Sequence, residues 1–126
     1  MIENLINFKE MFTCEKSIKI TTLGNITAIY INKMIGETFL ANQKFVYPDL
    51  VLHEEQMKIA FYFEKPRDYS EKIYKLYKIK RKGSLGYYVP IPAQLQRILF
   101  KSNKNPLINY KIGVSNKIMM ILLEKI

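Results

Sequence analysis

Cationic and aromatic side chains are concentrated in one stretch of this sequence, from Lys72 to Lys82. Six of its eleven residues are lysine or arginine, and tyrosines lie among them. Lysine and arginine neutralise phosphates, and tyrosine can pack on sugars or stack on unpaired bases for about 1–3 kcal/mol per base. The chemistry expected here is non-covalent binding of a nucleic acid. The candidate contact residues are Lys75, Tyr77, Lys78, Lys80, Arg81, Lys82, Tyr87, Arg97 and Lys101.

The charge of the chain is distributed unevenly. Its formal net charge is +9; residues 1–63 carry six Lys/Arg against seven Asp/Glu, whereas residues 64–126 carry fourteen against four. A one-sided positive field favours a polyanionic partner, because each neutralised phosphate releases condensed counterions. We expect a nucleic acid, with DNA favoured. The charge by itself also suits RNA, an acidic protein, an anionic lipid or a merely solubilising surface.

Residue types that carry covalent or metal chemistry are sparse. His53 lies beside Glu54 and Glu55, but neighbouring strand residues point to opposite faces, so His53 and Glu54 are not expected to converge. His53 is the only histidine and Cys14 the only cysteine, which excludes a two-histidine or cysteine-rich metal site within one chain. No nucleophile motif, phosphate-binding glycine loop or paired-carboxylate signature is present. We therefore expect a non-enzymatic protein without a cofactor or a bound metal.

The pattern of apolar residues predicts a mainly β fold with short helices. Helical spacing in "IENLINFKEMF" predicts a helix over residues 2–12. Strand-type runs then form a hairpin around "LGN", a helix capped by Asn32 and a second hairpin up to residue 65. After a linker at residues 66–72 the order is repeated, with a helix in "PAQLQRILF" that has proline at its first position. The predicted order is β-β-α-β-β, twice.

The two series can be superposed by a shift of 60 residues. This shift places apolar residues of repeat 18–65 on apolar residues of repeat 78–125, for example Ile29 on Val89, and "FYFEK" on "ILLEK". Such a pattern indicates an internal duplication, although two β-rich halves can also align by chance. We expect one domain over residues 1–126, built as a small β-barrel-like unit or a pseudo-dimer within one chain, with further oligomers possible.

The basic stretch is predicted to be one arm of a β-hairpin. Alternation places Lys75, Tyr77, Ile79 and Arg81 on one side and Tyr74, Leu76, Lys78 and Lys80 on the other. A ribbon with cations on both faces is of a size that a DNA major groove admits. Tyrosine is also common in strands, so packing in the core is the alternative role for Tyr87 and Tyr88.

No apolar run approaches the roughly 18 residues that cross a bilayer, and the N-terminus carries acidic residues where a signal peptide has a basic leader. We expect an intracellular protein that does not insert into a membrane.

The second repeat resembles the AbrB/MazE/MraZ group of swapped-hairpin DNA-binding domains. The resemblance lies in "KIKRKGSLGYYVPIPAQLQRIL" and "NYKIGVSNKIMMILLEK", in which Ile91-Pro92 ends a strand and Leu95 and Arg97 lie in the helix. It implies a transcriptional regulator that binds double-stranded DNA through the hairpin Lys78–Lys82 and through Arg97. The group builds its interleaved barrel from two chains, which a tandem repeat could replace. Pro90 departs from the pattern; it removes an amide from the ladder, which implies an edge or a bulge.

Two other hypotheses remain open. The order β-β-β-β-α from Asp49 to Phe100 also resembles Whirly-type single-stranded DNA binders, in which the same cations would follow the backbone and tyrosines would stack on bases. The third hypothesis is an interaction or inhibitor protein that binds a partner protein through a charged face.

Overall fold

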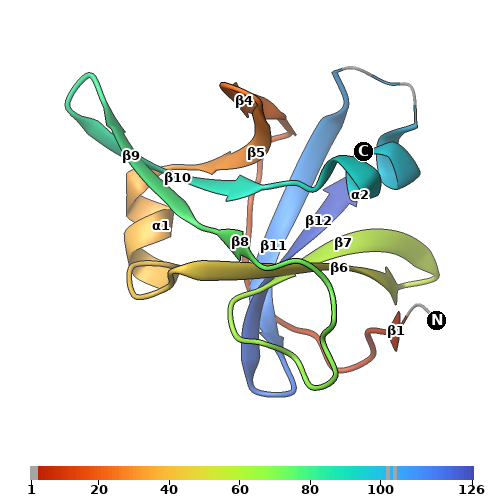
Figure 1. The fold of residues 1–126 in the computed structure, drawn as a ribbon. Coiled ribbons are helices and arrows are strands. Elements are labelled where there is room, and N and C mark those ends of the chain that lie inside the picture. Colours follow the sequence, from red (N-terminus) through yellow and green to blue (C-terminus); the bar gives the residue numbers. More distant parts are fainter. Residues whose placement is uncertain (1–2, 102, 104) are drawn as a thin grey trace.

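The computed structural model describes residues 3–101, 103 and 105–126, and the fold is mainly β with two short helices in these residues (Figure 1). The strands are β1 (Glu3–Asn4), β2 (Lys9–Thr13), β3 (Ile18–Lys19), β4 (Thr21–Leu23), β5 (Ile26–Ile31), β6 (Phe45–His53), β7 (Gln56–Tyr62), β8 (Tyr74–Lys75), β9 (Tyr77–Arg81), β10 (Ser84–Pro90), β11 (Leu107–Ser115) and β12 (Ile118–Lys125). The helices are α1 (Lys33–Phe39) and α2 (Ala93–Phe100). The order β4-β5-α1-β6-β7 is therefore followed, after the irregular residues 66–72 and the two-residue strand β8, by β9-β10-α2-β11-β12.

The strands form two main sheets, and each sheet contains one hairpin from each half of the chain. The short sheet has the order β4-β5-β10-β9. The long sheet has the order β1-β6-β7-β12-β11-β2, and β3 and β8 pair with β11 and β6. Because β5 pairs with β10 and β7 pairs with β12, neither half has a sheet of its own. The two halves are interleaved around one core.

The central pairings of both sheets match residues that are 60 positions apart. Val89 is opposite Ile29 in the short sheet, and Ile121 is opposite Phe61 in the long sheet. A two-fold axis that relates the two halves would pass through these two antiparallel pairs. All four side chains are buried in the main core between the sheets, and full burial of each such side chain contributes about 1.5–3 kcal/mol.

The hairpin of the second half is longer than its counterpart in the first half. β5 begins three residues before Ile29, whereas β10 begins five residues before Val89. Each arm of the β9–β10 hairpin therefore extends two residues further, and its tip stands away from the body of the protein in Figure 1.

The prediction of an N-terminal helix over residues 2–12 is wrong for the part that the structure describes; Ile2 lies outside it. The segment is extended, with β1 parallel to β6 and β2 antiparallel to β11. Leu5 is buried in a second apolar cluster on the outer face of the long sheet, with Phe8 packed against it. Pairing with β6 and β11 provides hydrogen-bond partners for the backbone of this segment, and the second apolar cluster buries Leu5. The segment therefore does not need to form a helix in order to bury its apolar residues.

The two helices begin as the sequence predicts, within one residue. Asn32 Oδ1 accepts a hydrogen bond from the Ile35 amide at 3.0 Å, which is the predicted cap of α1. Pro92 is the N-cap of α2 rather than its first helical residue. Neither of these helices is long and apolar enough to cross a membrane.

Pro90 lies on an inner strand, but at a position where the β9 side of that strand is unpaired, so the local edge that the sequence predicts is present. It is opposite Ala28 on the inner strand β10. The Ile91 amide donates to the Thr27 carbonyl, and successive residues of a strand direct their amides to alternate sides. The Pro90 nitrogen therefore faces the β9 side, beyond the last β9 pair at Tyr88 and Tyr77, where no ladder hydrogen bond is needed.

Candidate nucleic-acid interface

The basic hairpin is closed by the two-residue turn Lys82-Gly83. Both residues have positive φ, 50° at Lys82 and 78° at Gly83, as a type I′ turn requires. Glycine adopts this conformation without cost, whereas Lys82 accepts some strain. The turn places Arg81 opposite Ser84 and Lys80 opposite Leu85. Lys80, Arg81 and Lys82 are all exposed.

The inner face of the hairpin base is part of the core. Tyr87 is 3% exposed and packs in the main cluster. Burial, followed by the charge of Glu37, raises the pKa of the Tyr87 phenol. Tyr87 is therefore not accessible to a nucleic acid, and its assignment as a contact residue is wrong; packing is its role. Tyr88, 6% exposed, is also packed.

Lys78 is held at this base by the first half of the chain. Its ammonium donates to the Ala41 carbonyl at 2.7 Å and lies 5.8 Å from the centre of the Tyr87 ring. The contact orders the side chain while leaving its charge uncompensated, because a carbonyl is neutral.

Three tyrosines form a row across the outer face of the short sheet. Tyr77 is opposite Tyr88, and Tyr88 is opposite Tyr30. The rings of Tyr30 and Tyr88 are 5.3 Å apart, and the Arg81 guanidinium is 6.0 Å from the centre of the Tyr88 ring. Stacking of this kind holds Arg81 in place along the ribbon.

A groove of about 370 Å³ lies at the base of the hairpin, between β9 and the segment that follows α1. It brings Lys75, Tyr77 and Lys78 together with Lys44 and Phe45. The register explains this arrangement, since Phe45 is directly opposite Lys75 in the β6–β8 pair. Lys44 and Phe45 are not among the contact residues that the sequence predicts, because no local spacing connects them to the basic stretch.

Arg97 and Lys101 are exposed but lie away from the hairpin tip. They belong to α2 and its C-terminal cap, which follow the end of β10 opposite the turn (Figure 1). A strand of seven residues at about 3.3 Å each spans about 20 Å, which separates α2 from the tip. The structure therefore unites Lys75 and Lys78–Lys82 along one edge, without Arg97 and Lys101.

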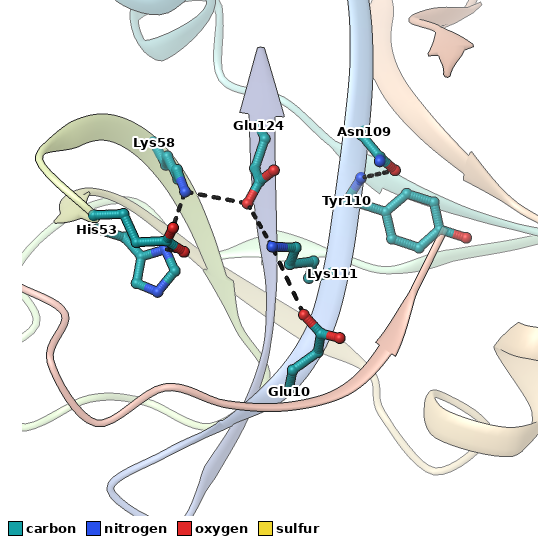
Figure 2. A network of polar contacts seen from close by, with 8 residues as sticks. Glu10, His53, Lys58, Asn109, Tyr110, Lys111 and Glu124 are labelled. Carbon is teal, nitrogen blue, oxygen red and sulfur yellow. Dashed lines mark hydrogen bonds and ion pairs between the residues drawn. The ribbon is translucent and has the colours of Figure 1, made fainter. Parts of the chain in front are cut away.

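A second polar cluster lies on the outer face of the long sheet (Figure 2). The ammonium of the buried Lys58 is 3.1 Å from Glu124 Oε1 and 3.0 Å from His53 Nδ1. Lys111 is 3.4 Å from Glu124 and 3.7 Å from Glu10. These strands, β7, β12, β11 and β2, are adjacent, so the cluster ties the N-terminal segment to the sheet.

The protonation states in this cluster follow from burial and from the neighbouring charges. Burial and then Lys58 lower the pKa of His53, which keeps it neutral near pH 7 with Nδ1 as the acceptor. Burial disfavours the charged form of Glu124, but Lys58 and Lys111 outweigh it and hold its pKa below the ordinary value. Burial lowers the pKa of Lys111. The charge of Glu124 and its hydrogen bond act the other way and outweigh burial, so the pKa of Lys111 is raised overall.

Contrary to the sequence-based expectation, His53 does meet Glu54, at 3.4 Å. Glu54 has φ 53° in the turn after β6, where strand alternation does not apply. Among the described residues there is no group of three His, Cys, Asp or Glu side chains that could hold a metal ion. The arrangement provides a structural ion-pair cluster.

A further hollow, of about 590 Å³, lies between α2 and the end of the linker. It has both signs of charge, from Asp49, Glu71 and Lys72. The Tyr69 hydroxyl lies 2.7 Å from the Lys72 carbonyl and 3.1 Å from the Pro48 carbonyl, which fixes the linker over β6.

No protein-family model matches this chain, and comparisons with curated proteins and with solved structures find no match either.

Proposed function

We propose that this is a non-enzymatic protein that binds double-stranded DNA through the β9–β10 hairpin and acts in transcription regulation. One observation carries the proposal: the part of the hairpin that extends beyond its counterpart in the first half is where Lys80, Arg81 and Lys82 lie exposed. None of the ion pairs found among the described residues involves these three side chains. Their charges are free to bind phosphates.

The shape of the hairpin supports a duplex as the ligand. A two-stranded ribbon fits the major groove, which is about 12 Å wide. The base of the ribbon is anchored in the core by Tyr87 and by the Lys78–Ala41 hydrogen bond. A rigid base and a free, cationic tip suit insertion between phosphate backbones.

The interleaved sheets support the resemblance to swapped-hairpin domains. Each sheet takes one hairpin from each half, as expected if a tandem duplication replaced two chains. The strands β6, β7, β9 and β10, on which the Whirly-type resemblance relies, are divided between the two sheets. We infer that the chain is a pseudo-dimer whose second half became the main contact surface for DNA.

The test is a salt titration of binding to a labelled blunt DNA duplex and to its separated strands. The variant Lys80→Gln/Arg81→Gln/Lys82→Asn removes three charges, and asparagine tolerates the positive φ at position 82. Each lost phosphate contact lowers the slope of log affinity against log salt by about 0.9. We expect weaker duplex binding to every sequence, with a slope smaller by up to about 3.

A matched control is Lys9→Gln/Lys33→Gln/Lys117→Asn, which removes three exposed charges outside the hairpin. It should retain most of the slope. An unchanged slope in the hairpin variant would refute the assignment. A clear preference of the wild type for separated strands would favour the single-strand hypothesis, and absence of binding to either at about 50 mM salt would favour a protein partner.

A further inference from the structure

We propose that the groove at the base of the hairpin binds an unpaired nucleotide of a DNA strand, with its base against Phe45 and its phosphate between Lys44 and Lys75. This inference rests on the proposed function and extends it, because it adds a contact for single-stranded DNA beside the duplex contact at the hairpin tip.

The charge of the groove selects an anion. Three lysines, Lys44, Lys75 and Lys78, line it, and no aspartate or glutamate does. Lys44 and Lys75 take part in none of the ion pairs found in the described part of the chain. Lys78 is oriented by the Ala41 carbonyl and so is already fixed before a ligand arrives. A pre-ordered cation loses less side-chain entropy on binding.

The remaining lining selects a flat apolar group. Phe45 is 51% exposed although it is a large aromatic residue at the start of β6. Tyr77 and Ile79, which also line the groove, are half-buried. A volume of about 370 Å³ falls in the range of sites that hold small organic ligands. A nucleotide unit joins a flat base to a phosphate, which matches an exposed ring flanked by lysines.

The groove is continuous with the hairpin. Both are built on β9, which is the edge strand of the short sheet, and Lys78 in the groove is two residues from Lys80, on the same face of the strand. Residues two apart in a strand are separated by about 6.6–6.8 Å. A strand that leaves a duplex held at the tip can therefore follow these cations into the groove.

The experiment compares a blunt DNA duplex with the same duplex that carries a short unpaired thymidine tail. We expect wild-type protein to bind the tailed duplex about 5-fold or more tightly than the blunt one, since stacking contributes a factor of about 5–150 per base. Phe45→Ala should abolish that gain and leave the affinity for the blunt duplex unchanged. Phe45→Tyr, which keeps a ring, should retain the gain.

Leu107→Ala, at a residue of similar exposure (46%), is the matched control and should retain the gain. Thermal melting of each variant verifies the fold. The inference is overturned if the tail gives no gain, or if Phe45→Ala weakens both ligands equally. In those cases binding of the blunt duplex still supports the proposed function, whereas failure of wild-type protein to bind either duplex refutes both.

Discussion

The ring of Tyr87, in β10, packs directly against the backbone of Gly36, in α1. A Cβ atom added to Gly36 would overlap the Tyr87 ring carbons. The two residues come from different halves of the chain, so this contact is one of the points at which the halves interlock. Glycine in the middle of a helix costs up to about 1 kcal/mol relative to alanine, and close approach of the tyrosine ring explains its presence.

Gly36→Ala should destabilise the protein, although it improves helix propensity. The new methyl group has to displace a buried ring, and overpacking of a core costs about 1–3 kcal/mol. Chemical denaturation measures the loss of free energy of unfolding. Met34→Ala, at a 78% exposed position of the same helix, should change it by less than about 0.5 kcal/mol. A stabilised Gly36→Ala variant would show that the ring does not pack there.

Arg97→Gln should have little effect on duplex binding. The residue lies on α2, about 20 Å or more from the hairpin turn by strand length, whereas the resemblance to swapped-hairpin domains implies a contact. Fluorescence anisotropy with the blunt duplex should show a much smaller loss than for Arg81→Gln. Equal losses for these two arginine variants would mean that the DNA contacts both ends of the short sheet.

Removal of Glu124 should be far more damaging than removal of Lys58. Glu124 is the shared partner of Lys58 and Lys111, so Glu124→Ala leaves a buried ammonium without a counter-ion, at a cost of about 3 kcal/mol. Lys58→Met replaces a buried charge by an apolar chain, and Glu124 keeps Lys111, so we expect a change within about 1 kcal/mol. Urea unfolding of both variants tests the order, and equal losses would contradict it.

His53 should make the protein less stable as the pH falls from neutrality. Its folded-state pKa is lowered from 6.5 by burial and by Lys58, so the unfolded state takes up the proton first. Stability is therefore retained above pH 6.5 and is lost between that value and the lower folded-state pKa. Melting temperatures across this window should fall for the wild type and fall less for His53→Gln, whose amide oxygen can still accept from Lys58.

The contribution of Glu124 to stability is lost at a more acidic pH than that of His53. The folded-state pKa of Glu124 is lowered, so its contribution is present above the ordinary glutamate pKa and is lost as the pH falls through the folded value.

An identical pH profile for wild type and His53→Gln from neutrality to mildly acidic pH would contradict the assignment to His53.

Local chemistry in the sequence was sufficient to predict the elements that carry the fold. Asn32 marked the start of α1, and the glycine at position 83 marked the turn of the basic hairpin. Alternating apolar residues identified the strands of both halves, because residues on one face of a strand recur with period two wherever that face is buried. The repeated element order followed from the same pattern.

The N-terminal segment is the part of the described fold that local spacing predicts wrongly. Apolar residues with helical spacing predict a helix there, but β11 and β6 have free strand edges, which pair with β2 and β1. A short helix is marginal by itself, whereas edge pairing satisfies the backbone. Local spacing does not reveal which edges remain free.

The sequence by itself determined the β-rich elements, the site of the positive charge and the repeated order, because each depends on residue types and short spacings. Only the tertiary structure decided that Tyr87 is buried, that Arg97 is remote from the tip, and that Lys44 and Phe45 join Lys75 in one groove. These relationships depend on how two interleaved halves pair across the chain. Long-range register is set by the packing of the whole core rather than by any local pattern.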